Sequence, residues 1–143
     1  MAEKKHTLRL EQVGTAAFEA TAAGGGSLIV DGSPDIGGEG RGMRPTEVLL
    51  AALASCSAMD VVNILRKQRQ PLEHLSIEIE GVRKDAVPAP FKSAHLVFTV
   101  RGAVEEPKLQ RAVSLAVEKY CSVRATLDPA VEITWEARNA SDM

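Results

Sequence analysis

Two hydrophobic periods alternate along the chain, and each predicts one kind of element. Leu75, Ile77 and Ile79 alternate with polar residues, which is the two-residue period of a half-buried strand. The same period returns twice further on, and three short apolar runs near the N-terminus are separated by glycine turns. Six strands are therefore predicted, at residues 7–11, 17–22, 27–31, 75–80, 94–101 and 131–136.

A helical period fills the segment from Pro45 to Gln68. Pro45 suits the first helical turn, Glu47 places negative charge near the positive end of the dipole, and Pro71 limits the helix. A second helix is predicted from near Pro107 to just after Cys121. The first helix has a core face, and its opposite side is also apolar, so we expect it to be covered on both sides. The opposite side carries Leu49, Ala52, Cys56, Met59 and Val62.

The element order, strands, long helix, strands, helix and strand, predicts an α+β fold with antiparallel sheets packed on a long central helix. We expect residues 1–143 to form a single domain, with a glycine-rich mobile loop at 32–42 and a frayed tail at 138–143. One protomer of this size would not bury both sides of the long helix. A homodimer is therefore predicted.

Composition and charge exclude several classes of partner. The net charge is −2 and aromatic residues are 3% of the chain, so neither a basic surface nor an aromatic stacking platform for nucleic acid is expected. The polar N-terminus predicts no secretory signal, and the apolar run from Val48 to Val62 is shorter than the roughly 20 residues of a membrane span. We therefore expect a cytoplasmic protein that binds neither nucleic acid nor membrane, with reduced cysteines.

The two cysteines, Cys56 and Cys121, are the strongest candidates for chemistry. One interpretation makes both of them small buried hydrophobic residues, as free cysteines usually are. The other makes them a redox pair, because each is flanked by serine in an apolar segment and each lies on a helix predicted to face the same sheet. A disulfide between them would contribute roughly 4 kcal/mol, provided that their Cα atoms come within about 7 Å.

Peroxide chemistry at a cysteine requires a thiolate and hence a nearby cation. Arg41, Arg44 and Arg124 are candidates, and Glu47 could orient such an arginine. Alternatively, Arg44 and Glu47 form only an exposed pair worth under about 1 kcal/mol.

Three other site chemistries have weaker support. The histidines, at positions 6, 74 and 95, are scattered and lie at no metal-ligand spacing from either cysteine, so no metal is expected. A Cys–His hydrolase would need His95, which is predicted on an exposed strand face. The glycines of residues 32–42 match no phosphate-binding motif.

Two segments carry a family resemblance. The segment Arg44 to Val62, with a Pro-x-Glu helix start and a cysteine nine residues after the glutamate, resembles the first cysteine motif of the OsmC/Ohr family. Glu118-Lys119-Tyr120-Cys121-Ser122-Val123 resembles the second. The residues around both cysteines are most similar to those of the YhfA-like branch of the family, and the resemblance covers nearly the whole chain.

The resemblance implies an intertwined α+β homodimer that reduces organic hydroperoxides or hydrogen peroxide without a bound cofactor. Cys56 would be the peroxidatic cysteine, Cys121 the resolving cysteine and Glu47 the carboxylate that holds the activating cation. An external thiol or dihydrolipoyl group would restore the reduced form.

The chain departs from the family pattern at one position. Relatives supply an activating arginine after the first strand, whereas the corresponding turn here, residues 13–16, has none. Arg44 either replaces this cation or is solvated. The alternative function is a non-enzymatic dimer that binds a small apolar ligand or senses redox state through its thiols.

Overall fold

The computed structural model describes the backbone of residues 3–142 and the side chains of residues 3–141. The chain divides into two compact units, and the single domain predicted from the sequence stays a prediction. The N-terminal unit reaches to Leu49, and the C-terminal unit begins at Leu50, within helix α1 (Pro45–Lys67). The two units are therefore described separately.

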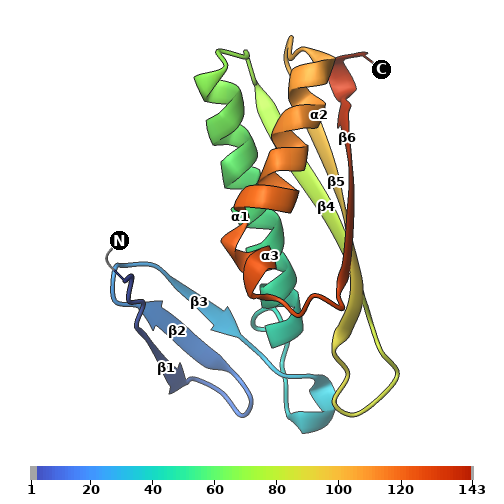
Figure 1. Ribbon diagram of the computed structural model, residues 1–143. Helices are drawn as coiled ribbons and strands as arrows, with labels where there is room; N and C mark the ends of the chain where they lie inside the picture. The colour runs from blue at the N-terminus through green and yellow to red at the C-terminus, as the bar shows by residue number, and fades with distance from the viewer. Residues whose placement is uncertain (1–2, 143) are drawn as a thin grey trace. The chain divides into compact units, whose positions relative to one another are not determined.

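The N-terminal unit contains an antiparallel sheet of three strands in the order β1-β2-β3 (Figure 1). The strands are β1 (Leu8–Gln12), β2 (Phe18–Ala22) and β3 (Ser27–Val30), as the apolar runs predict. Glycine turns separate β2 from β3, where Gly25 and Gly26 both take positive φ values of 104° and 92°. Glycine adopts this backbone conformation without a steric penalty, which explains the glycine run between the two strands.

The glycine-rich segment 32–42 has a defined set of hydrogen bonds instead of the open loop that its composition suggests. Asp31 is buried, and its carboxylate accepts the backbone N–H groups of Gly32, Glu39 and Arg41 at 2.8, 2.9 and 3.1 Å. A short 3₁₀ turn, η1 (Pro34–Ile36), lies within this segment. One carboxylate thus organises ten residues of backbone. The predicted mobility of the segment stays a prediction.

The C-terminal unit contains a second sheet in the order β4-β5-β6. Its strands are β4 (His74–Arg83), β5 (Phe91–Arg101) and β6 (Glu132–Asn139). The antiparallel pairing of β4 with β5 is as predicted, but the prediction of antiparallel sheets throughout is wrong at β6, which runs parallel to β5. A helical crossover between β5 and β6 returns the chain to the starting end of β5, which makes the parallel pairing possible.

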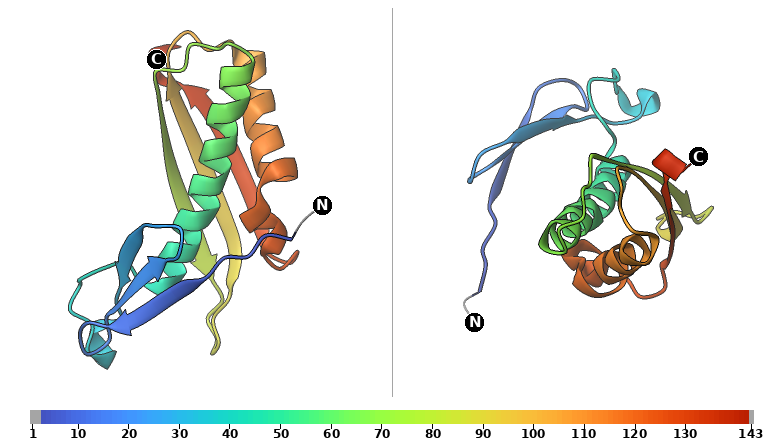
Figure 2. Two further views of the ribbon diagram at one scale, coloured as in Figure 1. Left: turned by 90° about the vertical axis from the view of Figure 1, so that its left-hand side faces the viewer. Right: turned by 90° about the horizontal axis from the view of Figure 1, so that it is seen from above.

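Helices α1 and α2 (Glu106–Leu115) cover the same face of this second sheet (Figures 1 and 2). The alternate residues of β5 from Ala94 to Val100 point into this layer and are buried. Residues of both helices complete the hydrophobic core, among them Leu53, Val61, Leu65, Leu109 and Val113.

Helix α1 confirms the predicted element from Pro45 to Gln68 almost residue for residue. Its buried residues, Leu53, Ser57, Val61 and Leu65, follow one another at intervals of four and form one stripe. Other apolar residues of α1, such as Met59 at 69% exposure, remain open. By length and composition alone α1 would also suffice to cross a membrane, a test that the core helices of soluble proteins pass as well.

The second predicted helix is interrupted before Cys121. After α2, residues Ala116–Tyr120 form a π-helical turn, η2, and a separate short helix α3 (Ser122–Thr126) follows. A π turn accommodates one more residue than an α-helical turn and is common at functional sites. Cys121 therefore lies between two helices in an extended conformation (φ −70°, ψ 107°) instead of within a continuous helix.

Hydrogen bonds join part of the segment 138–143 to the turn after β5, and the predicted fraying of this tail stays a prediction. β6 continues to Asn139, which is buried and donates from Nδ2 to the carbonyl of Gly102 at 2.8 Å. The hydroxyl of Ser141 accepts the N–H of Gly102 at 3.0 Å. These bonds attach residues 139–141 to the turn after β5. Met143 lies outside the described residues.

Candidate functional site

The two cysteines come together in the C-terminal unit, although 65 residues separate them in the sequence. Cys56 lies half-buried on α1, and Cys121 lies buried, at 4% exposure, directly after η2. Both are free thiols, and each packs in or against the hydrophobic core. The side chain of Cys56 is close enough to Cys121 to act on its ionisation. The more exposed thiol, Cys56, therefore lies next to the buried thiol of Cys121.

The surroundings of Cys121 hold its thiol in the protonated form. Burial is the main cause of a raised pKa, because it disfavours the charged thiolate. The backbone N–H of Arg124 and the hydroxyl of Ser57 act in the opposite direction, whereas contact with Cys56 and its negative charge raise the pKa of Cys121 further. The pKa of the Cys121 thiol is therefore raised above its ordinary value.

Cys121 also caps the helix that follows it. Its Sγ accepts the N–H of Arg124 at 3.4 Å, which satisfies one of the free N–H groups at the start of α3. The Arg124 guanidinium donates from Nη1 to the carbonyl oxygen of Val117 at 3.1 Å. Arg124, the candidate cation near Cys121 in the sequence, therefore forms its side-chain hydrogen bond with the backbone of the η2 turn.

Ser57 is a site residue that the sequence analysis includes only as a serine beside Cys56. It is fully buried, and its hydroxyl forms no hydrogen bond of good geometry with any residue that the structure describes. The hydroxyl nevertheless lies close enough to the Cys121 sulfur to lower the pKa of that thiol. The sequence shows Ser57 next to Cys56, but only the packing shows that its hydroxyl lies near the Cys121 sulfur.

Glu47 and Arg44 meet at the start of α1 through the backbone. Glu47 Oε1 accepts the Arg44 N–H at 2.9 Å, which is the reciprocal half of a capping box. The side chains of residues 3–141 include no Arg44–Glu47 ion pair. Instead, the Arg44 charge contributes to a lowered pKa at Asp35, where the hydroxyl of Ser33 is the main cause.

Arg41 brings a guanidinium to the turn where the sequence lacks an arginine. Its Nη1 donates to the carbonyl oxygen of Val13, 28 residues earlier. Gly14 leaves room for this contact, because a Cβ there would lie 2.9 Å from Nη1. The sequence named Arg41 as a candidate cation without indicating this position, since a loop contact over such a separation has no local signature.

His95, the histidine that a Cys–His hydrolase would need, lies on the sheet face away from the helical layer. His95 lies between the buried residues Ala94 and Leu96 of β5, so it points to the sheet face opposite the helices, where its Nδ1 lies 2.6 Å from Thr134 Oγ1. This position gives a Cys–His hydrolase no support. Within the described residues, no group of three or more His, Cys, Asp or Glu side chains has the arrangement of a metal site.

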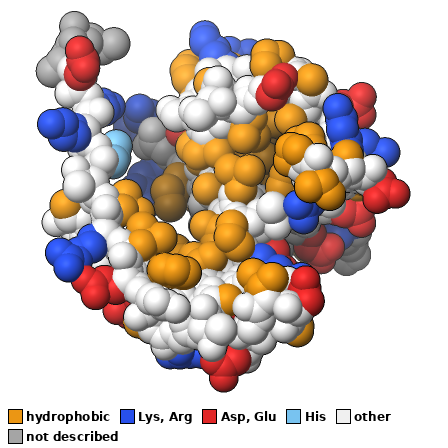
Figure 3. All heavy atoms as spheres, turned by 90° about the horizontal axis from the view of Figure 1, so that it is seen from below, with side chains coloured by type: hydrophobic (Ala, Val, Ile, Leu, Met, Phe, Trp, Pro, Cys, Tyr) orange, Lys and Arg blue, Asp and Glu red, His pale blue; other side chains and the backbone are white. Residues whose placement is uncertain are grey.

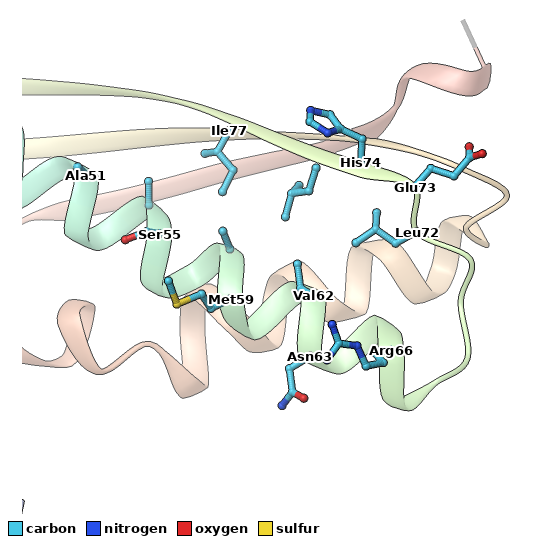
Figure 4. A pocket seen from close by; sticks show the side chains of 13 residues that line it. Ala51, Ser55, Met59, Val62, Asn63, Arg66, Leu72, Glu73, His74 and Ile77 are labelled. Carbon is cyan, nitrogen blue, oxygen red and sulfur yellow. The ribbon is translucent and has the colours of Figure 1, made fainter. Parts of the chain in front are cut away.

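An apolar groove runs between the open side of α1 and strand β4 in the C-terminal unit (Figure 4). Its volume is about 740 Å³. Small residues of α1, including Ala51, Ala54 and Ala58, form one wall, and Leu72, Leu75 and Ile77 contribute the other. Hydrophobic side chains are also plentiful on the face of the molecule drawn in Figure 3. Of the five residues that the sequence places on the side of α1 opposite the core, Met59 and Val62 line this groove.

The chain belongs to the OsmC family. The sequence model of that family, described as OsmC-like protein, matches residues 38–136, which include both cysteines. This match confirms the resemblance on which the sequence assignment of the cysteine motifs rests.

Individual relatives support the family at the level of sequence and fold. The chain is 35% identical to Protein YhfA of Escherichia coli strain K12 over 127 residues. These residues cover 88% of this chain and 92% of the relative. A hypothetical protein from Aquifex aeolicus VF5 is 31% identical, with a TM-score of 0.81 over 96% of this chain and 98% of the other. An organic hydroperoxide resistance protein OsmC from Legionella pneumophila shares the fold, with a TM-score of 0.71 at 16% identity over 96% and 98% of the two chains.

Proposed function

We propose that this protein is a thiol-dependent peroxidase that reduces organic hydroperoxides or hydrogen peroxide in defence against oxidative stress. The observation that carries the proposal is the pairing of a half-buried Cys56 with a buried Cys121 whose thiol stays protonated. Membership of the OsmC family and the fold shared with an organic hydroperoxide resistance protein support the same chemistry.

The proposed reaction has three balanced steps. The Cys56 thiolate attacks the terminal oxygen of the hydroperoxide, the O–O bond breaks, and an alcohol leaves after it takes up a proton, so Cys56 becomes a sulfenic acid. The Cys121 thiol then attacks the Cys56 sulfur, and a disulfide and water form. Two external thiols, or one dihydrolipoyl group, reduce this disulfide by exchange and become oxidised to a disulfide themselves. No bound cofactor is needed.

The asymmetry of the two thiols suits these separate roles. A peroxidatic cysteine must be reachable and ionised, whereas a resolving cysteine needs to be protected until a sulfenic acid forms next to it. Cys56 is the more exposed of the two, and burial raises the pKa of Cys121. We therefore assign Cys56 as peroxidatic and Cys121 as resolving.

The activating cation is a separate part of the proposal. We retain Glu47 as the carboxylate that orients the cation, and we propose Arg44 and Arg41 as the two arginines to test, the second because it reaches the turn at Val13. Substitution of the activating arginine by glutamine will move the pH dependence of Cys56 oxidation to higher pH, because a cation lowers the pKa of a neighbouring thiol. Lys92→Gln, at an exposed position of β5, is the matched control for loss of one positive charge.

We further propose that the protein acts as a homodimer in the cytoplasm. The open apolar side of α1, with Met59 at 69% exposure, offers a surface for a second copy. Two free thiols agree with a reducing compartment. Sedimentation of wild-type protein at twice the protomer mass, and of Met59→Glu at a lower mass, will test the dimer.

The catalytic proposal is tested by steady-state turnover of cumene hydroperoxide with an external dithiol. Cys56→Ser will lose turnover. Cys121→Ser will accumulate a sulfenic acid at residue 56, which dimedone traps and mass spectrometry detects. Unchanged turnover in Cys56→Ser would exclude the enzyme assignment.

The groove beside α1 favours one alternative function, a non-enzymatic dimer that binds a small apolar ligand. A volume of about 740 Å³ is within the range of small-molecule sites, and the lining is mostly apolar. In that case the thiols would line the protein core or sense redox state, and Cys56→Ser would leave ligand binding unchanged. Titration of Cys56→Ser with an environment-sensitive apolar dye distinguishes this function from the peroxidase.

A further inference from the structure

One polar side chain interrupts the buried stripe of α1. Leu53, Val61 and Leu65 of this stripe are apolar, whereas Ser57 carries a hydroxyl and is fully buried. The hydroxyl forms no hydrogen bond of good geometry with any residue that the structure describes. A buried polar group without a partner costs free energy, and native proteins keep few of them. Packing does not explain the serine, because an alanine would fill nearly the same space.

Ser55, on the other side of Cys56 in the sequence, shows how a serine within a helix commonly satisfies its hydroxyl. Ser55 is exposed, and its Oγ donates to the carbonyl oxygen of Ala52, three residues earlier, at 3.3 Å. Such bonds to the preceding turn of the helix are frequent. Ser57 forms none within the described part of the chain, so its O–H proton stays available for another acceptor.

The neighbour of the Ser57 hydroxyl is the sulfur of Cys121. The hydroxyl is near enough to act on the ionisation of that thiol, and Cys121 is itself buried at 4% exposure. The same sulfur accepts the N–H of Arg124 at 3.4 Å. Two donors, one from α1 and one from the first turn of α3, therefore meet at one sulfur in the core. Cys56 is the titratable group beside this sulfur, and the Arg124 guanidinium is bonded to the carbonyl oxygen of Val117.

Cys121 has most need of these donors at one point of the proposed cycle. As a protonated thiol it behaves as a small, nearly apolar side chain. When it attacks the Cys56 sulfenic acid, its S–H bond breaks and negative charge forms on a sulfur that burial separates from water. Donated hydrogen bonds stabilise that charge, and they are stronger to a charged acceptor than to a neutral one. The free energy that the buried hydroxyl costs in the reduced protein is thus offset when Cys121 reacts.

We propose that Ser57 is a further catalytic residue of the resolving step, in which its hydroxyl donates a hydrogen bond to the Cys121 sulfur as that sulfur attacks Cys56. This inference rests on the proposed function for the step that consumes the sulfenic acid. The S–S bond forms as the S–O bond of the sulfenic acid breaks, so Cys121 is oxidised and the Cys56 sulfur is reduced. The hydroxide that leaves combines with the proton from Cys121 to give water. Ser57 keeps its own proton throughout.

The attack by Cys121 can be timed without any peroxide. One equivalent of 2,2′-dithiodipyridine converts the more exposed Cys56 to a mixed disulfide and releases one 2-thiopyridone. Cys121 then attacks Cys56, which forms the Cys56–Cys121 disulfide and releases a second 2-thiopyridone, whose absorbance gives the rate of closure. Cys121→Ser is expected to show the first release alone.

Ser57→Ala is expected to slow closure about threefold at pH 7. Loss of the hydrogen bond lowers the fraction of Cys121 thiolate about tenfold, and the more basic thiolate that remains is about threefold more nucleophilic. The pH dependence of closure will therefore move to higher pH, and the ratio of the two rates will approach one as the pH rises. The release from Cys56 is expected to be unchanged. Ser55→Ala is the matched control and is expected to leave both releases as in wild type.

The same step sets the sensitivity of the protein to excess hydroperoxide. A sulfenic acid at Cys56 that waits longer for Cys121 is more often oxidised further to a sulfinic acid. Ser57→Ala is therefore expected to yield about threefold more Cys56 sulfinic acid per turnover of cumene hydroperoxide at pH 7. Mass spectrometry of the peptide that contains Cys56 measures this yield.

Three results would overturn the inference. Closure as fast in Ser57→Ala as in wild type at every pH would mean that the hydroxyl takes no part. Closure slowed by one constant factor at every pH would mean that Ser57 only packs against Cys121. A single 2-thiopyridone from wild type would mean that Cys121 does not reach Cys56. The peroxidase proposal fails by a different result, namely normal closure in a protein whose thiols do not react with hydroperoxide.

Discussion

Ser57→Ala is expected to stabilise the reduced protein although it lies in the middle of the core. The Ser57 side chain is fully buried, and its hydroxyl has no hydrogen bond of good geometry among the residues described. A buried polar group without a partner costs about 1–3 kcal/mol. The contact with the Cys121 sulfur recovers part of that cost, so we expect a gain at the lower end, of about 1 kcal/mol.

Urea unfolding of the reduced protein measures this gain. With an m-value of about 2 kcal/mol/M, the unfolding midpoint of Ser57→Ala will rise by roughly 0.5 M. The substitution deletes a single oxygen atom, so the loss of packing is small. Ser55→Ala, one helical position before Cys56 and exposed, is the matched control and is expected to leave the midpoint unchanged.

The same substitution will also affect the thiol. The Ser57 hydroxyl lowers the pKa of Cys121, so its removal will raise that pKa. In a Cys56→Ser background, iodoacetamide alkylation of Cys121 will therefore shift to higher pH when Ser57 is replaced by alanine. A Ser57→Ala protein destabilised by more than about 1 kcal/mol would refute the reasoning, because the hydroxyl would then have a strong partner.

Three further predictions concern charge and packing. Asp31→Asn will lower the melting temperature at pH 7, because backbone N–H groups of Glu39 and Arg41 are the main causes of a lowered pKa at Asp31. This stabilisation exists above pH 3.8 and is lost as the pH falls through the lower folded-state pKa, so wild type and Asp31→Asn will converge in acid. Burial raises the pKa of Asp60, so its contribution to stability is present below pH 3.8 and is lost as the pH rises through the folded-state pKa. Asp60→Asn will therefore gain stability relative to wild type between pH 3.5 and 7 in thermal unfolding, and a constant difference would contradict this. Phe98→Ala, at a fully buried position of β5, will cost about 3–5 kcal/mol in urea unfolding, and a loss below about 1 kcal/mol would show that β5 is not at the centre of the core.

Local pattern predicts most of the elements of this fold. The two-residue period marks all three strands of the second sheet, and the proline, glutamate and apolar sequence of residues 45–67 marks α1. These signals are local because each depends on one face of one element. The pairing of β6 has no such signal, because the direction of a strand depends on the crossover helix before it.

The candidate site is predicted in its residues but not in its geometry. The two cysteine motifs identify Cys56 and Cys121, whereas the π turn before Cys121 and the bond from the Arg124 N–H to the Cys121 sulfur are seen only in the folded chain. The contact of Arg41 with the Val13 carbonyl and the burial of Asp60 Oδ2 both depend on how segments pack in space. No periodicity of the sequence encodes them.

The most direct test of the central claim is a count of free thiols after reaction with a limiting amount of cumene hydroperoxide. The account predicts the rapid loss of two thiols per chain, with one hydroperoxide consumed for each pair of thiols. After digestion, the peptide that contains Cys56 will be joined by a disulfide to the peptide that contains Cys121. Cys56→Ser will show no such loss. Thiols that disappear only at the rate of the uncatalysed reaction, or equally fast in Cys56→Ser, would contradict the account.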